Sequence, residues 1–324
     1  MLATTIKFPR RAAILLTVFL SANFTWLAAN GCLARAQEHG KASANAEHGM
    51  FIVFLGTGMP RPDPQRQGPS LAIVANGKAY LVDAGTGVVR EAAAAFQRGI
   101  SALQPPKLEI AFLTHLHSDH TLGLPDLILT PWVMHRTVPL QLYGPVGTQA
   151  MADNIEKAYA EDIQVRIEGL EHQTTTGHQV VAHEIQPGAV YQDAKVKVTA
   201  FSVKHGSWKE ALGYRFDANG KSVVISGDTR PGESVEQACN GCDVLVHEVY
   251  SGTLPKQEDD GYFASFHTSA EQLGEIAAKA RPKILVVWHY VPLRDANQAK
   301  MAEEIHRNFH GTVVVANDLD VISP

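Results

Sequence analysis

Three histidines and one aspartate lie within six residues of the stretch FLTHLHSDHTLGLPDL (112–127), directly after an apolar run. They are His115, His117, Asp119 and His120. Imidazoles and a carboxylate held together in a folded protein must be hydrated, hydrogen-bonded or bound to a cation. Nitrogen and oxygen donors of these types are common metal ligands. The stretch therefore predicts a metal site.

Three further candidate ligands come directly after other predicted strands. They are His205 after 196–203, Asp228 after 222–226 and His289 after 284–288. Loops at strand ends on a rigid scaffold are where chemistry concentrates. Seven nitrogen and oxygen donors suit one or two zinc ions better than calcium or magnesium. Two ions sharing one carboxylate can polarise a substrate oxygen and lower the pKa of a water.

The elements that must position these side chains are closely spaced, with no linker between them. The predicted strands are 51–55, 71–75, 79–83, 108–113, 140–144, several within 163–203, a hairpin over 212–228 around Asn219-Gly220, then 243–248, 284–290 and 312–318. The predicted helices are 88–97, 121–134, 148–160, 235–239, 269–280 and 295–309. Strand pairs mixed with helix–strand alternation predict an α/β fold, a four-layer αββα sandwich with two sheets face to face.

The first 36 residues differ in composition from the rest of the chain. A basic start (KFPRR) precedes an uncharged apolar run (12–29) and then ARA (34–36). This layout predicts an export signal cleaved after Ala36, hence a periplasmic or secreted protein without stable membrane insertion; a retained anchor is the alternative. Residues 37–49 are expected to be a flexible lead-in to a domain over 50–324.

Charge and cysteine content limit the classes of partner. With 45% hydrophobic and 19% charged residues, the chain is neither disordered nor a coiled coil. Cleavage removes four basic residues and no acid, which changes the formal charge from −5 to −9 and disfavours polyanion binding. Cys239 and Cys242 form CNGC, which predicts either a small disulfide or two small apolar residues.

The ordered motifs resemble the metallo-β-lactamase superfamily, and within it the ribonuclease Z-like members. THLHSDH followed by LGLP carries the resemblance, with FLGTGMPRPDPQRQGPS, LVDAGTG, VKHGSWKEALGYRF, ISGDTR, LVHEVY and HTSAEQLGEIA in the same order. The likeness covers nearly the whole chain after residue 36. It implies an αββα metallo-β-lactamase fold and a hydrolase with two zinc ions per chain, although manganese or iron could use the same ligands.

The resemblance also implies a role for each residue. His115, His117 and His205 would bind the first ion, Asp119, His120 and His289 the second, and Asp228 would bridge the two. Asp119 would also orient the attacking hydroxide. His267, held by Glu248, would protonate the leaving group, because an imidazole beside a carboxylate can supply a proton near neutral pH.

The chain departs from the ribonuclease Z pattern where tRNA would be gripped. Processing members carry a long arm between the GYRF-type and SGDT strands, but only DANGK separates them here. Three further features make tRNA an unlikely partner. They are the acidic charge of the chain, its expected export, and the acidic stretch QEDD (257–260) in the loop 251–266. The preferred function is therefore an exported phosphodiesterase acting on small phosphodiesters or nucleotides.

Other functions stay open at this stage. A lactonase, β-lactamase or arylsulfatase would use the same two-metal site on a small ester. A non-catalytic zinc-binding protein would be favoured by a missing ligand, and none is missing. The sequence does not decide the oligomeric state, and a homodimer is compatible with it.

Overall fold

The computed structural model describes residues 49–253 and 261–324, which belong to one compact unit of the chain. The predicted export signal (1–36), its cleavage after Ala36 and nearly all of the predicted lead-in lie outside the described residues. Within the described ranges, no helix combines the length and apolar character needed to span a bilayer.

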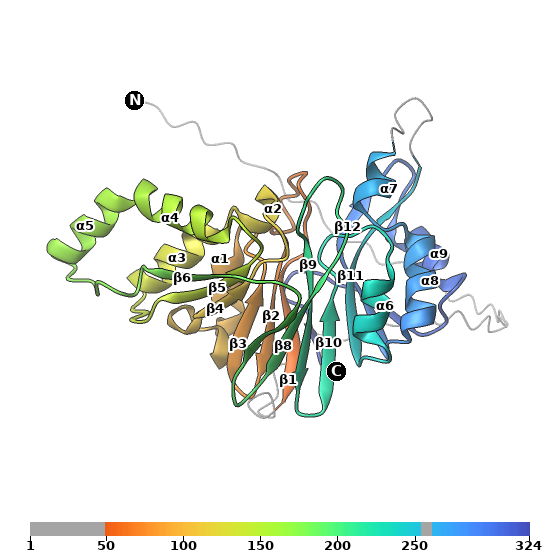
Figure 1. The fold of residues 1–324 in the computed structure, drawn as a ribbon, viewed down its shortest axis with the longest axis horizontal. Coiled ribbons are helices and arrows are strands. Elements are labelled where there is room, and N and C mark those ends of the chain that lie inside the picture. The colour runs from red at the N-terminus through yellow and green to blue at the C-terminus, as the bar shows by residue number, and fades with distance from the viewer. Residues whose placement is uncertain (1–48, 254–260) are drawn as a thin grey trace, which may run out of the picture. The chain divides into compact units, whose positions relative to one another are not determined.

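Two seven-stranded sheets form the centre of the domain (Figure 1). The first sheet has the order β14-β1-β2-β3-β4-β5-β6, with β14 Val321–Ile322, β1 Met50–Gly56, β2 Ser70–Ala75, β3 Lys78–Val82, β4 Ile110–Phe112, β5 Leu140–Gly144 and β6 Val180–Glu184. The second has the order β13-β12-β11-β10-β9-β8-β7, with β13 Thr312–Val315, β12 Ile284–Pro292, β11 Val244–Ser251, β10 Lys221–Ile225, β9 Leu212–Ala218, β8 Lys197–Ser202 and β7 Gly188–Gln192.

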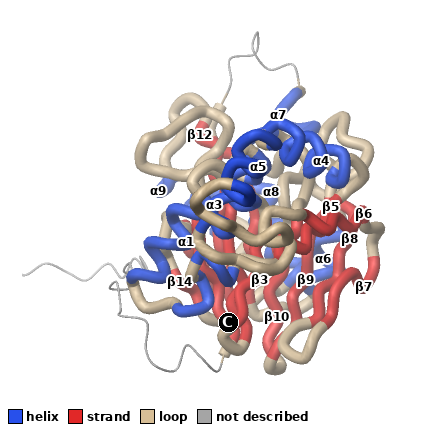
Figure 2. The backbone as a smooth tube through the Cα atoms, turned by 90° about the vertical axis from the view of Figure 1, so that its left-hand side faces the viewer, coloured by secondary structure: helices blue, strands red, loops and turns tan. Residues whose placement is uncertain are grey.

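Helices cover the outer face of each sheet. On the first sheet lie α1 Val88–Gln97, α2 Ser118–Thr121, α3 Leu124–Val133, α4 Thr148–Ala158 and α5 Ala160–Glu168, with short 3₁₀ turns at Ser101–Leu103 and Pro105–Lys107. The helices associated with the second sheet are α6 Glu233–Cys239, α7 Tyr262–Phe266, α8 Ala270–Ala280 and α9 Gln298–His306. Figure 2 shows α1, α3 and α5 in front of the strands. The predicted αββα sandwich is confirmed.

Strand β1 shows why three apolar layers form. Ile52 and Phe54 point into the core between the sheets, whereas Phe51, Val53 and Leu55 point into the core under α1 and α3. Successive side chains of a strand alternate between its faces, so a continuously apolar strand must be covered on both sides. A third apolar core, with Leu245, Leu273 and Met301, fills the space between the second sheet and its helices.

The structure corrects the predictions in four places. Residues 163–168 are the end of α5 and not a strand. The β-branched Val165 and Ile167 suggested a strand, but an Arg166–Asp162 ion pair one turn apart supports the helix. Strand β4 is shorter than predicted, β12 runs on past His289 to Pro292, and β14 was not foreseen.

The loop predicted over 251–266 is partly ordered structure. Strand β11 reaches Ser251, and residues 262–266 form α7. Its acidic stretch QEDD (257–260) lies outside the described residues.

A buried arginine ties α3 to the first sheet. Arg136 is 1% exposed and donates to the backbone carbonyls of Leu108, Leu127, Ile128 and Gly177. Burial lowers its pKa to about 10. Because these carbonyls satisfy the buried guanidinium, the end of α3 is held against the segment that leads into β4.

Candidate metal centre

The histidine cluster is delivered by the end of β4 and the short helix α2. Thr114 donates its backbone N–H to Asp83 Oδ1 at 2.8 Å, which fixes the chain just before His115. Gly123 then packs so closely on the 84–85 backbone that a Cβ there would lie 2.1 Å from the Gly85 oxygen. This close approach presses α2 and its side chains against the sheet edge.

The second sheet brings its ligands from separate segments. His205 follows β8 and Asp228 follows β10, as predicted. His289 lies within β12, where the pairing with β11 shifts register, and its φ is +52°. Such a bulge re-aims a side chain. It turns His289 toward Asp228. The helices α2 and α7 lie at the upper edge of the domain in Figure 1.

The structure brings all seven predicted ligands together, as two donor sets of three residues with Asp228 between them. The first donor set is His115, His117 and His205, and the second is Asp119, His120 and His289. In the first, His117 Nδ1 lies 2.9 Å from His115 Nε2 and 3.1 Å from His205 Nε2. In the second, Asp119 Oδ2 lies 3.2 Å from His289 Nε2 and 3.5 Å from His120 Nε2.

Asp228 lies between the two donor sets. Its Oδ1 is 3.5 Å from His120 Nε2, and its Oδ2 is 3.6 Å from His289 Nε2 and 3.9 Å from His205 Nε2. This carboxylate thus faces members of both sets. The position is the one that a bridging ligand needs.

The donors fit a pair of metal ions. His120 Nε2 and Asp228 Oδ1 are buried and make no hydrogen bond. A buried polar atom without a partner is costly, and a cation between them would remove that cost. Five imidazoles and two carboxylates are donors that zinc accepts, as manganese or iron would. The donor set does not identify the metal.

The two donor sets differ in protonation. Burial lowers the pKa of all three imidazoles of the first set, that of His117 to about 4. In the second set burial acts in the same direction, but the neighbouring carboxylates together outweigh it, Asp228 with Asp83 at His120 and Asp228 with Asp119 at His289, and raise the pKa of both rings. A metal binds the neutral imidazole. The lowered pKa values of the first set favour the neutral rings that a metal binds, whereas the raised values of the second set disfavour them.

Contacts at the second ring nitrogen, Nδ1, hold three of the candidate imidazole ligands in place. Asp83 accepts from His120 Nδ1 at 2.8 Å, Thr114 Oγ1 lies 3.0 Å from His115 Nδ1, and the Phe266 carbonyl lies 2.8 Å from His205 Nδ1. Sequence reasoning missed Asp83. The signal was present, because the residue ends a strand in LVDAGTG, next to the strand that carries the cluster.

His267 and Glu248 lie beside the metal ligands, as predicted. His267 Nδ1 is 3.3 Å from Glu248 Oε2 and 4.0 Å from Asp228 Oδ2. The other oxygen, Glu248 Oε1, accepts from the backbone N–H groups of Thr229 and Thr268. Burial disfavours the charged ring, but Glu248 outweighs it and raises the pKa of His267 to about 9. A protonated His267 can donate a proton.

Four aromatic residues, Trp132, Trp208, Tyr262 and Phe266, have different positions relative to the donor sets. Trp132 is fully buried and donates to the Thr174 carbonyl, so it is a core residue. Phe266 lies against His205, with 5.0 Å between ring centroids, and the exposed Tyr262 stacks on Phe266 at 4.4 Å. Trp208 Nε1 donates to His117 Nε2 at 2.7 Å. Three of these rings therefore border the metal centre or extend it outward.

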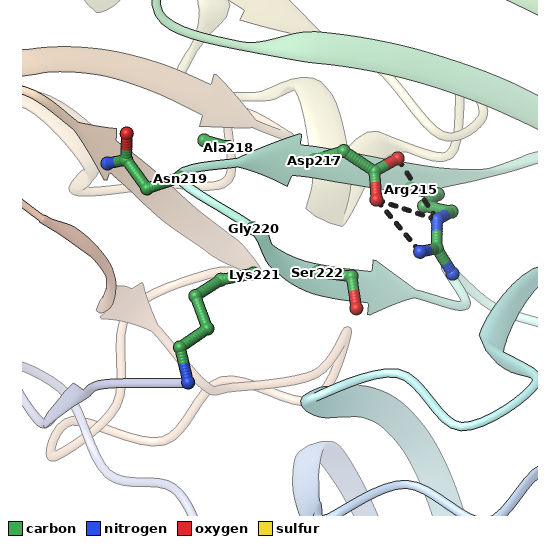
Figure 3. Close-up of a pocket in the computed structure, with 7 residues that line it drawn as sticks. All are labelled: Arg215, Asp217, Ala218, Asn219, Gly220, Lys221 and Ser222. Carbon is green, nitrogen blue, oxygen red and sulfur yellow. Dashed lines mark hydrogen bonds and ion pairs between the residues drawn. The ribbon is translucent and has the colours of Figure 1, made fainter.

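A hollow of about 370 Å³ lies elsewhere, over the β9–β10 turn (Figure 3). Its Arg215 is paired with Asp217, 2.8 Å away. The turn is at the opposite end of β10 from Asp228. In that hollow, none of the lining residues is a histidine or a cysteine. The donors suited to catalysis thus gather at the other edge of the sheets.

Sequence comparison gives consistent relatives. The β-lactamase superfamily domain matches residues 78–290. Ribonuclease Z of Mycobacterium bovis is 35% identical to the chain over 276 residues, which cover 83% of the chain and 96% of the relative. Ribonuclease Z of Mycolicibacterium gilvum is 36% identical over 254 residues, covering 76% and 86% respectively.

Solved structures show the same fold. The metallo-β-lactamase fold protein YhfI from Bacillus subtilis matches with a TM-score of 0.65 and 18% identity, over 85% of this chain and 99% of that one. The short form of human tRNase Z matches with a TM-score of 0.60 and 24% identity, over the same shares. Both likenesses agree with the two-sheet architecture described above.

Proposed function

Because the chain belongs to the β-lactamase superfamily, and within it to the ribonuclease Z-like metallohydrolases, we propose that it is a two-metal phosphodiesterase acting on small phosphodiesters or nucleotides. The observation that carries the proposal is the meeting of two complete donor sets around Asp228 with the His267–Glu248 pair beside them. A simple metal-binding protein would have no need of a buried ion pair at the edge of its site.

Each residue has a task in this proposal. His115, His117 and His205 would hold one ion, Asp119, His120 and His289 the other, and Asp228 both. Bound metal ions would polarise the phosphoryl oxygen and lower the pKa of a water. Asp119 would accept a hydrogen bond from the attacking water and so aim it. Glu248 would hold His267 at Nδ1 and stabilise its charge, and His267 would donate its Nε2 proton to the leaving oxygen.

Two features support a small substrate. The β9–β10 hairpin turns at Asn219-Gly220, both at positive φ, so no arm extends there. The chain is also acidic overall, which weakens any long polyanion contact. The second candidate is RNA cleavage, which the 35% identity to proteins named ribonuclease Z favours.

A parallel turnover assay tests the proposal. The purified protein, with metal content measured on the same sample, would be given bis-p-nitrophenyl phosphate, a precursor tRNA, an acyl-homoserine lactone, a chromogenic cephalosporin and p-nitrophenyl sulfate. We expect the diester to be turned over most efficiently and the His117→Ala variant to lose activity. Faster turnover of the lactone, lactam or sulfate would refute the phosphodiesterase proposal, and faster cleavage of the precursor tRNA would favour the second candidate.

We further propose that the protein is exported and processed after Ala36. The apolar run at 12–29 and the following ARA support this. The Cys239–Cys242 disulfide also supports it, because disulfides persist in oxidising compartments. Amino-terminal sequencing of protein from the periplasmic and culture fractions tests it. Recovery of only the unprocessed chain in the cytoplasm would contradict it.

A further inference from the structure

Three aromatic side chains of α7, namely Tyr262, Phe263 and Phe266, lie together and are called the aromatic shelf below. The Tyr262 ring stacks on the Phe266 ring, with 4.4 Å between centroids and 22° between planes. The Phe263 ring meets Tyr262 almost at right angles, with 5.3 Å between centroids. Tyr262 nevertheless remains 45% exposed, whereas the two phenylalanines are half-buried. The shelf therefore has an anchored inner part and an exposed outer ring.

The inner part of the shelf is fixed by contacts with the segment after β8. The backbone N–H of Gly206 donates to the Ser265 carbonyl at 3.0 Å. Gly206 also leaves space for the shelf, because a Cβ there would lie 2.0 Å from Phe266 Cζ. None of these contacts involves the Tyr262 ring. Anchoring of α7 therefore does not by itself explain why an aromatic side chain stands at its exposed start.

The position of Tyr262 distinguishes it from other exposed aromatic residues. Exposure alone does not indicate a binding residue, because single exposed apolar side chains are common. Tyr159 is exposed to nearly the same extent, 42%, but it lies at the junction of α4 and α5. The Tyr262 ring lies 6.4 Å from the ring of His267. A flat group resting on the shelf would thus lie next to the residue proposed to protonate the leaving oxygen.

We propose that the aromatic shelf binds the nucleobase of a nucleotide substrate, on the leaving-group side of the bond that breaks. Every nucleobase has a π-face that stacks on aromatic side chains. Uncharged rings suit a substrate that is held by one base and not by a run of phosphates, in keeping with the acidic chain. This inference deepens the proposed function and rests on it for the side of the substrate that the base occupies.

Binding of adenosine tests the shelf without turnover. Adenosine carries a base but no phosphate, and ribose is the matched ligand without the base. We expect isothermal titration of the purified protein to detect binding of adenosine and not of ribose. The Tyr262→Ala protein should bind adenosine roughly 5- to 150-fold more weakly, the effect of losing one base–aromatic stack. The Tyr262→Phe protein keeps the ring and should bind adenosine as the unaltered protein does.

Tyr159→Ala is the matched control, because it removes a tyrosine of similar exposure from another part of the surface. Its affinity for adenosine should be unchanged. Equal affinity of the Tyr262→Ala and unaltered proteins would overturn the proposal. Binding of ribose as tight as that of adenosine, or no binding of adenosine, would also overturn it, and these two results need no variant to fold.

The products formed from methyl adenosine 5′-phosphate test the side on which the base lies. Water attacks phosphorus, and one of two bonds breaks. If the base-bearing alcohol leaves, its 5′ oxygen takes a proton and the products are adenosine and methyl phosphate. Adenosine monophosphate and methanol would instead show that the base lies on the other side, and the proposal would fail. Tyr262→Ala should raise KM for this ester but not for methyl ribose 5-phosphate.

The binding and turnover experiments separate this inference from the proposed activity. A protein that binds adenosine through Tyr262 but cleaves no phosphodiester would retain the base-binding shelf and refute the phosphodiesterase. A phosphodiesterase that is active on bis-p-nitrophenyl phosphate but binds no adenosine would retain the proposed activity and refute the shelf.

Discussion

The two sheets contribute to the metal centre in different ways. The first sheet supplies four of the seven candidate ligands from six consecutive residues, His115 to His120, and buried side chains such as Asp83 hold them from behind. The second sheet supplies His205, Asp228 and His289 from three separate segments. His205 Nδ1 lies against a backbone carbonyl, whereas His289 Nδ1 has no hydrogen-bond partner.

This difference has a physical consequence. A cluster that is continuous in the chain needs only a local turn, here α2, to bring its donors together. Donors from separate segments depend on strand register, because a shift of one residue moves a side chain to the other face. The first sheet should therefore define the site, and the second should complete it and join its halves.

Replacing Asp228 should have the largest effect on metal binding and turnover, since this residue of the second sheet faces both donor sets. The Asp228→Asn variant should lose at least one bound metal. Its turnover should fall by more than roughly 100-fold, the upper limit usual for residues that only hydrogen-bond to metal ligands. Metal analysis and turnover on the same sample measure this. The control is Asp217→Asn on the adjoining hairpin, at the far edge. Two retained metals with normal turnover would show that Asp228 does not bridge.

His267→Ala separates catalysis from metal binding within the second sheet. The variant should keep both metals and slow diesters with poor leaving groups by roughly 10²- to 10⁴-fold. Esters of p-nitrophenol should be much less affected, because that leaving group departs without a proton. Comparison of kcat for the two kinds of diester measures the effect. An equal loss of kcat for both kinds of diester would show that His267 does not act as the general acid.

Asp83→Asn tests whether the first sheet's buried support matters. The amide cannot hold His120 Nδ1–H as the carboxylate does, so affinity for the second metal should fall about 10- to 100-fold. The first metal should be bound as before. Chelator competition followed by metal analysis distinguishes the two ions. An unchanged affinity for both would mean that Asp83 only fixes the backbone at Thr114.

Asp243→Asn should have the smallest effect, because Asp243 lies on the second sheet away from the metals. Burial would raise its pKa, but the contacts from Lys283 and Ser222 outweigh it and lower the pKa to about 2. A lowered pKa stabilises the fold above the ordinary value near 3.8, and this stability is lost as pH falls through 2. We expect a loss of about 1–2 kcal/mol at pH 7 that disappears near pH 2. Urea unfolding across this range measures it, and a loss independent of pH would contradict it.

Features encoded in short stretches could be predicted from sequence. Asn76-Gly77 and Asn219-Gly220 both turn hairpins with positive φ at both residues, as such pairs favour. Ser269 and Gln272, three residues apart, form a capping box at the start of α8. The sequence left the state of Cys239 and Cys242 open, and the structure has them joined in a disulfide.

Features that depend on distant residues were missed. Nothing near Arg136 in the chain announces that carbonyls from four other residues will satisfy its buried charge. Trp208 contacts His117, from which it is separated by 91 positions in the chain. Helix α5 was missed because its β-branched residues outweighed the charge pairs that stabilise it.

The sequence by itself determined that this chain carries a metal-binding cluster, that its ribonuclease Z-like motifs stand in order, and that two sheets must pack face to face. These are matters of residue type, spacing and alternation along the chain. Only the tertiary structure decided that Asp228 lies between two donor sets, that a bulge turns His289 toward them, and that Asp83 contacts His120 while Trp208 contacts His117. Those relations depend on strand pairing and packing between segments far apart in the chain, which no local pattern contains.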